Sequence, residues 1–172
     1  MAQHFFARVG GHIQRVFAIV TSAGAADAGK IPALNGSGYL DNSFLAPGIG
    51  VNQFVAPASE ALSAGNYVNL HDDAGTLKIR KADNSNGRPA WGYVESAVTG
   101  GADATAKRLN TINSNHSGLT PGIDYWLGVA GGVIATPLDA TDVATAGKVC
   151  QYLGKAKSAT ELVTVEEAPV YL

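Results

Sequence analysis

The sequence of 172 residues has one cysteine and few charged side chains. The single thiol, Cys150, has no partner for an intramolecular disulfide. Residues 148–153 around it resemble a strand, which favours a small buried hydrophobe over a catalytic thiol. Charged residues make up 15% of the chain, against about 25% in a typical soluble domain. A surface with so little charge is expected of a protein that neighbouring molecules partly cover, and it is expected equally of a glycine-rich β-protein with many turns.

The chain also lacks a strong net charge and a long apolar run. Its formal charge of −2 gives no field that would attract nucleic acid or an anionic membrane. Lys78 and Arg80 alternate along the chain, which favours the solvated face of a strand over a phosphate-binding strip. The apolar run 16–20 is far shorter than the ~20 residues that span a bilayer. No secretory signal is evident, so we expect synthesis in a reducing cytoplasm.

A nucleotide-binding loop is suggested by residues 24–30, GAADAGK, but its context is wrong. A P-loop continues with Ser or Thr, which holds magnesium, and then with a helix whose N-terminus receives phosphate. Here Ile31 and Pro32 follow. The magnesium ligand is missing and a helix is disfavoured, so the sequence does not predict nucleotide binding.

No catalytic or metal-binding set of residues emerges from the remaining polar side chains. Glu166 and Glu167 are adjacent, and neighbours on a strand point to opposite faces, so they cannot easily act together. No Gly-x-Ser-x-Gly elbow is present. The histidines lack the spacing of metal ligands; they are His4, His12, His71 and His116. The sequence therefore predicts a protein that is not an enzyme and that binds no metal or cofactor.

The first part of the chain, residues 1–53, is predicted to be an extended, irregular N-terminal arm. Glycine and proline are dense between residues 21 and 50, which disfavours both helix and regular sheet. Apolar side chains interrupt this stretch, whereas a disordered linker would be depleted in them. An arm that places these side chains in a partner's pockets explains both features, and a loop packed on its own domain is the alternative. The candidate contacts are Phe5, Phe6, Phe17, Leu34, Leu40, Phe44 and Leu45.

Residues 54–172 are predicted to form an all-β domain, a small closed barrel or sandwich-like structure. Short β-type runs alternate with turn signals, a pattern typical of barrels and sandwiches. Residues 140–147 could form one helical turn. The expected strands are 66–71, 76–81, 91–98, 107–112, 125–129, 148–153 and 161–165.

An internal echo suggests that this domain is duplicated. Residues 62–68, LSAGNYV, resemble residues 119–125, LTPGIDY. Each segment precedes a hairpin, centred on Gly75 or on Gly131 and Gly132. Each half then reaches a strand that begins with glycine, at Gly92 or Gly154. We interpret the two stretches as halves of one closed β-domain, whose closure would protect the sheet edges.

The aromatic residues of this domain are assigned to its core, which is the usual place for them. A carbohydrate-binding platform is the functional alternative for some of them. The residues concerned are Tyr67, Trp91, Tyr93, Tyr125 and Trp126.

Two segments resemble a recurrent stretch of tailed-bacteriophage structural proteins: residues 26–35, ADAGKIPALN, and 38–44, GYLDNSF. They share the form Gly-Lys-Ile-x-Ala-Leu-(Asn/Asp)-x-x-Gly-x-(Leu/Ile)-Asp. Later pieces resemble the same proteins, so the likeness covers most of the chain. They are 62–66 (LSAGN), 80–83 (RKAD), 88–94 (RPAWGYV), 118–122 (GLTPG), 151–156 (QYLGKA) and 158–162 (SATEL).

This resemblance implies a head decoration, or cement, protein at the capsid surface of the virion, assembled in the cytoplasm of the host bacterium. Such a protein clamps adjoining major capsid proteins and stabilises the head against internal DNA pressure. It is often a symmetric oligomer, and we expect a homotrimer here. Similar β-domains occur in tail fibres, so a tail-associated structural or receptor-binding module is the alternative. The chain is short and shows no coiled coil or repetitive shaft, which favours the head.

Overall fold

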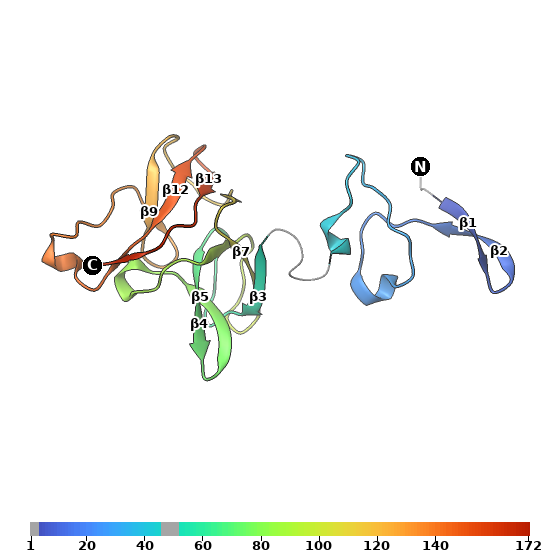
Figure 1. Ribbon diagram of the computed structural model, residues 1–172, viewed down its shortest axis with the longest axis horizontal. Coiled ribbons are helices and arrows are strands. Elements are labelled where there is room, and N and C mark those ends of the chain that lie inside the picture. The colour runs from blue at the N-terminus through green and yellow to red at the C-terminus, as the bar shows by residue number, and fades with distance from the viewer. Residues whose placement is uncertain (1–3, 46–51) are drawn as a thin grey trace. The chain divides into compact units, whose positions relative to one another are not determined.

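The computed structural model describes residues 4–45 and 52–172, and the chain divides into two compact units, residues 1–50 and 51–172 (Figure 1). Strands are the main regular structure in both units, and no α-helix occurs within the described ranges. The all-β fold class predicted from the sequence is therefore confirmed.

The N-terminal unit begins with a regular hairpin that the sequence pattern did not reveal. Strand β1 (His4–Val9) pairs antiparallel with β2 (His12–Phe17) around Gly10 and Gly11. Both glycines have positive φ, 59° and 87°, as the favoured two-residue hairpin turns require. Beyond the hairpin this unit is irregular, with two short 3-10 turns, η1 (Gly24–Asp27) and η2 (Asn42–Phe44).

The second unit contains two five-stranded antiparallel sheets. The first sheet has the order β3-β7-β6-β4-β5 and the second has the order β10-β9-β12-β13-β8. A short third pairing joins β11 to β14. The strands of the first sheet are β3 (Gln53–Pro57), β4 (Tyr67–Asp73), β5 (Thr76–Lys81), β6 (Gly92–Val94) and β7 (Asp103–Arg108). The other strands are β8 (Ile112–Asn113), β9 (Asp124–Leu127), β10 (Val133–Ile134), β11 (Val149–Cys150), β12 (Tyr152–Ala156), β13 (Leu162–Thr164) and β14 (Val170–Tyr171).

Most of the expected strands have a counterpart in these sheets. The expected strand 107–112 does not, because the chain turns between β7 and β8, where Asn110 has a φ of 72°. The helical turn expected within residues 140–147 is the 3-10 turn η4 (Val143–Thr145), and a further 3-10 turn, η3 (Asn84–Asn86), follows β5.

The two sheets have the same topology, which supports internal duplication. If β11 is set aside and the five strands of each sheet are numbered in chain order, both sheets have the spatial order 1-5-4-2-3. Both hairpins turn through an alanine and a glycine at positive φ: Ala74 and Gly75 in the first, Ala130 and Gly131 in the second. The repeat thus extends from sequence to strand order and turn geometry.

Hydrogen bonds at equivalent positions join the strands of each sheet. Val94 N donates to Asn66 O at 3.0 Å, and in the second sheet Ala156 N donates to Ile123 O at 2.9 Å. The register agrees as well, because Val68 pairs with Gly92 as Tyr125 pairs with Gly154. The segments that looked alike in the sequence therefore occupy equivalent positions.

Gly92 and Gly154 are required at these positions for the same steric reason. A Cβ on Gly92 would lie 2.2 Å from Lys107 O, and one on Gly154 would lie 2.0 Å from Val163 O. Both contacts are with backbone, which cannot move aside without breaking the strand pairing. The repeated glycines thus let neighbouring strands approach closely in each sheet.

The two sheets stack in the same orientation, so that non-equivalent faces meet. The inner face of the first sheet is the one with Val68, the inner face of the second is the equivalent one with Leu127, and the opposite faces are called outer. The outer face of the first sheet, with Tyr67 and Tyr93, packs on the inner face of the second, with Leu127, Leu153 and Leu162, and forms the main core. The inner face of the first sheet encloses a separate core; its buried members are Ala56, Ala58, Leu62, Val68, Ile79, Val94, Ala104 and Ala106. One sheet therefore has both faces covered, whereas the second has a covered inner face only.

The sandwich-like architecture agrees with the prediction, but neither large sheet closes into a barrel. In the first sheet the two edges approach at a single parallel bridge between Ala58 and Ile79. In the second sheet β10 and β8 remain separate edges. These two edge strands have only two residues each, which limits their pairing with another chain.

Candidate functional site

The candidate contacts predicted in the N-terminal arm are all at least partly accessible. Phe6 is 66% exposed, Phe17 52% and Leu34 56%, and Leu40 and Leu45 are also exposed. Phe5 and Phe44 are half-buried. Among the residues described in this unit, only Ala33 is a buried apolar residue. The structure therefore presents these side chains without giving them a core of their own.

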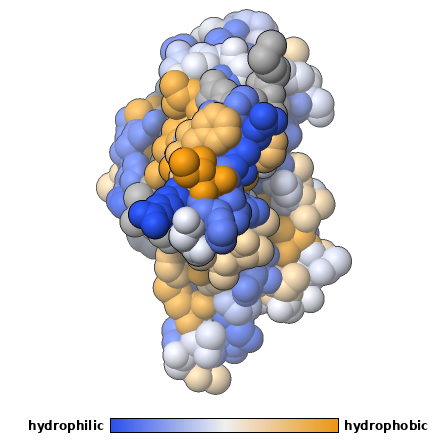
Figure 2. Space-filling view, turned by 90° about the vertical axis from the view of Figure 1, so that its right-hand side faces the viewer, coloured by the Kyte–Doolittle hydropathy of each residue, from blue (hydrophilic) through white to orange (hydrophobic). Residues whose placement is uncertain are grey.

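Three of these contacts lie on the β1–β2 hairpin. Phe6 shares one face with His4, whose ring lies 6.1 Å from the Phe6 ring and 6.0 Å from the Phe17 ring. Phe5 lies on the other face, opposite Val16. Both faces of the hairpin thus carry apolar side chains, which is why its sequence shows no period-two alternation. Figure 2 shows apolar surface beside hydrophilic surface on one face of the molecule.

Local hydrogen bonds, rather than a core, shape residues 18–45. Ile19 N donates to Ile31 O at 3.0 Å, and Ala33 N donates to Ile19 O at 2.7 Å. Asn35 Oδ1 accepts from the backbone N–H groups of Ser37 and Tyr39, both at 3.0 Å. Such short-range bonds define the path of the chain while its apolar side chains remain accessible.

The segment that resembles a P-loop, residues 24–30, is held by hydrogen bonds among its own and adjacent residues. Lys30 Nζ donates to Asp27 Oδ1 at 2.6 Å, and Ala23 N donates to Asp27 Oδ2 at 2.6 Å. These two bonds lower the pKa of the Asp27 carboxyl, the backbone bond contributing most. The lysine that would reach a phosphate in a P-loop is thus paired with a carboxylate.

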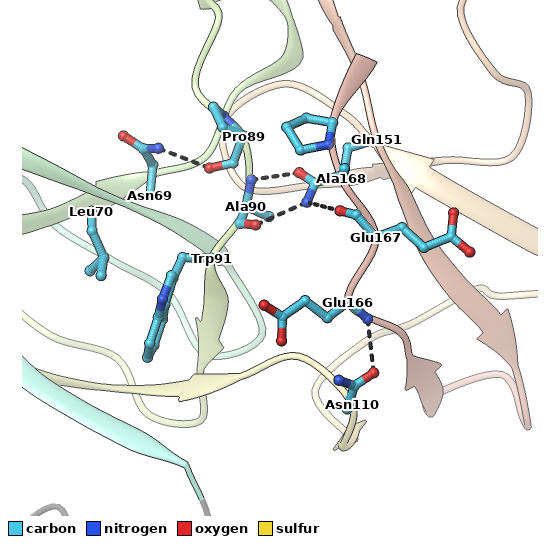
Figure 3. A pocket seen from close by; sticks show the side chains of 11 residues that line it. Asn69, Leu70, Pro89, Ala90, Trp91, Asn110, Gln151, Glu166, Glu167 and Ala168 are labelled. Carbon is cyan, nitrogen blue, oxygen red and sulfur yellow. Dashed lines mark hydrogen bonds between the residues drawn. The ribbon is translucent and has the colours of Figure 1, made fainter.

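The second unit contains a pocket of about 590 Å³ where its repeats meet the C-terminal segment (Figure 3). Leu70 and Trp91 form one wall and residues 166–169 the other. The residues that line the pocket come from distant parts of the sequence. From the sequence, therefore, Trp91 is considered only as an aromatic candidate, and Glu166 and Glu167 only as a carboxylate pair.

The polar groups of this pocket hold its walls together. Gln151 Oε1 accepts from Ala90 N at 2.7 Å, and Gln151 Nε2 donates to Ala90 O at 3.0 Å. Asn69 Nδ2 donates to Pro89 O at 2.9 Å, and Asn69 Oδ1 accepts from Arg80 Nε at 2.9 Å. These amides are therefore engaged within the protein.

The two carboxylates point apart, as expected for adjacent residues on an extended chain (Figure 3). Arg108 Nε and Nη2 donate to the Glu166 carboxylate at 2.9 and 2.5 Å, a bidentate pair that lowers the Glu166 pKa. The same guanidinium lies over the Trp91 ring, 5.9 Å from its centroid. The Phe54 ring meets Trp91 edge-on at 6.0 Å. Trp91 is thus already packed and is a poor platform for a sugar.

The other aromatic candidates differ in exposure. Tyr67, Tyr93 and Tyr125 are buried in the main core, as the core assignment predicted. Burial raises the pKa values of Tyr67 and Tyr93. Trp126 instead lies half-buried on the outer face of the second sheet, beside Tyr152. Trp126 is therefore the aromatic candidate best placed for an external partner.

The histidines are dispersed. His116 stacks on Tyr67 with ring centroids 5.7 Å apart, and burial lowers its pKa. His71 Nε2 lies 3.2 Å from Ser59 Oγ, and its pKa is also lowered, mainly by burial. In the two described ranges of the chain, no group of three or more His, Cys, Asp or Glu side chains could hold a metal ion. Within the same ranges, no helix has the length and apolarity of a membrane span.

Comparison with known proteins gives one distant structural likeness to report. No protein-family model and no curated protein matches the chain. The crystal structure of the head fiber gp8.5 N base in bacteriophage phi29 aligns with 66% of this chain and 92% of that one, at 16% sequence identity and a TM-score of 0.42. This similarity is too weak to bear on fold or function.

Proposed function

We propose that the protein is a non-enzymatic structural protein of a tailed-bacteriophage virion that acts as a head decoration, or cement, protein. The N-terminal unit binds across adjacent major capsid proteins, and the second unit forms a knob on the capsid surface. The observation that carries this proposal is the unit of residues 4–45, which displays its apolar side chains and buries almost none of them. The resemblance of its sequence to phage structural proteins supplies the context.

The physical argument concerns what an isolated unit of this kind lacks. A lone two-stranded hairpin is marginally stable in water. Burying one large apolar side chain contributes about 1.5–3 kcal/mol, so the candidate contacts together offer on the order of 10 kcal/mol before the costs of ordering. Binding to a capsid would provide that burial. Repetition over a shell would add avidity and resist the internal pressure of the DNA.

A tail or tail-fibre-associated structural or receptor-binding module is the second candidate function. The observation that favours it is the position of Trp126 and Tyr152, whose rings lie 5.6 Å apart on the outer face of the second sheet. Aromatic side chains at a surface are common features of binding sites. Binding of the purified protein to host cells would support this function, and absence of binding would count against it.

Reconstitution of heads tests the cement function. Heads that lack the protein are mixed with the purified full chain, and bound protein and the temperature of DNA release are measured. We expect saturable binding and a higher release temperature. The double variant with Phe6→Ser and Phe17→Ser should raise the dissociation constant for heads by about 30-fold or more, as expected when residues at the centre of an interface are truncated. The control is Val143→Ser, because Val143 is 91% exposed in the second unit. Unchanged binding by the double variant would contradict the proposal.

A further inference from the structure

The outer face of the second sheet has an unusual composition for a solvated surface. The residues on this outer face are Ile112, Asp124, Trp126, Ile134, Tyr152, Lys155 and Val163, which cross-strand pairing places on one side of the sheet. The other side is the buried core. An antiparallel sheet with one face on the core normally exposes a polar face, yet most of these side chains are apolar or aromatic.

The two charged residues of the outer face neutralise each other. Lys155 Nζ lies 2.8 Å from Asp124 Oδ1, and Tyr152 Oη donates to the same carboxylate oxygen at 2.9 Å. Ile112 and Val163, which pair directly across β8 and β13, are 40% and 44% exposed. The result is a strip of aliphatic and aromatic side chains around one internal ion pair, a composition that marks interaction surfaces.

The internal repeat shows how the equivalent face of the first sheet is used. Tyr67 and Tyr93 occupy the positions of Asp124 and Lys155, because Tyr67 pairs with Tyr93 as Asp124 pairs with Lys155. Both tyrosines are fully buried under the second sheet. The outer face of this repeat is thus already an interface in the first sheet, and its partner there is a sheet of the same chain. The second sheet has the corresponding face, and residues 52–172 contain no further repeat that covers it.

We propose that the outer face of the second sheet is a self-association surface, on which the same face of another copy of this chain docks. A third sheet stacked in the same head-to-tail way is not available from another copy, because the inner face of the first sheet encloses its own core. When two such faces dock, their strips of aliphatic and aromatic side chains contact each other. It also brings Lys155 of one copy toward Asp124 of the next, since both signs lie side by side on the face. This inference goes beyond the cement function and does not require a capsid.

The mass of the purified full chain in solution, measured by light scattering after size-exclusion chromatography over a range of concentrations, tests the proposal. We expect a dimer, because a face that docks on the same face of another copy joins two chains about a twofold axis. The homotrimer that the resemblance implies would need a contact other than this one. Val163→Lys on β13 and Ile112→Lys on the neighbouring edge strand β8 each place a charge among the apolar side chains of the strip, and each should raise the dissociation constant for self-association by about 30-fold or more. Both residues are part-exposed, so the monomer should still fold, which circular dichroism verifies. Val143→Lys, the same substitution at the exposed valine of η4, is the matched control and should leave the oligomer intact.

Each outcome decides the proposal. An oligomer that dissociates with Val163→Lys or Ile112→Lys but not with Val143→Lys supports it. A wild-type monomer at every concentration overturns it and leaves a capsid protein or a host glycan as the occupant of this face. An oligomer that persists in both folded variants also overturns it. Because no heads are used, this result is independent of whether the protein binds a capsid.

Discussion

The two units of the chain use their apolar residues in opposite ways. In the second unit, tyrosine, leucine and valine side chains from both sheets fill two cores. In the N-terminal unit, the described residues bury only Ala33 among the apolar side chains, and Phe6 and Phe17 remain exposed. The second unit therefore has its own source of stability, whereas the first has side chains suited to a partner. The difference teaches that stability and binding are located in different parts of this chain.

The sharpest test of this comparison is one truncation in each unit. Leu153→Ala removes a fully buried side chain from the main core and should cost about 2–5 kcal/mol of unfolding free energy. Phe17→Ala should change that free energy by less than about 0.5 kcal/mol, as usual for a surface position. Denaturant unfolding of the full chain, followed by circular dichroism so that both units contribute to the signal, measures both. Equal losses would show that the first unit also has a core.

The repeated glycines give a smaller but more specific effect. Gly92→Ala and Gly154→Ala should each destabilise the second unit by about 1–3 kcal/mol, because the new Cβ meets backbone. Gly36→Ala in the first unit is the control, since nothing lies within 4 Å of its added Cβ. Thermal unfolding monitored by circular dichroism reports all three. A neutral Gly154→Ala variant would contradict the close strand approach in the second sheet.

Acidification should weaken the second unit through its partly buried histidines, His71 and His116. Burial lowers the pKa of His116 below its ordinary value of 6.5, so the unfolded chain binds a proton first as the pH falls. The stabilisation is fully present above about pH 6.5 and declines as the pH falls through the lower folded-state pKa. His71 contributes in the same direction. Unfolding free energies measured between pH 7.5 and about 5 should therefore fall, and His116→Gln should reduce the slope. An unchanged slope in the His116→Gln variant would show that groups other than His116 cause the loss of stability at low pH.

The smallest expected effect is that of the ion pair at the pocket. Arg108 and Glu166 are 44% and 39% exposed, so Glu166→Gln should cost no more than about 1 kcal/mol in unfolding free energy. Arg108→Ala should cost somewhat more, because it also removes the guanidinium from the Trp91 ring. Comparison of the two variants by denaturant unfolding separates the charge from the packing. A larger loss for Glu166→Gln would give the ion pair a greater role.

The sequence predicted the repeat well because turns and close strand approaches require particular residues. The echo between residues 62–68 and 119–125, and the matching Gly92 and Gly154, correspond to equivalent backbone positions. It did not predict how the sheets stack. The run Asp124 to Leu127 has apolar side chains on both faces of its strand, so alternation cannot show that Trp126 lies outside and Leu127 inside.

The remaining misses have similar causes. The hairpin of residues 4–17 has apolar side chains on both faces, which hides its period, although Gly10 and Gly11 were a usable turn signal. The pocket depends on segments that only the tertiary structure brings together, from Asn69 to Pro169. The candidate contacts in the N-terminal arm are exposed or half-buried side chains, and both their role as contacts and their partner remain predictions.

Localisation of the protein by cryo-electron microscopy of the intact virion tests the central claim most directly. The cement function predicts knobs of the second unit over the icosahedral shell, with density of the N-terminal unit lying across neighbouring major capsid proteins. Density confined to the tail would contradict that function and favour the tail-associated alternative.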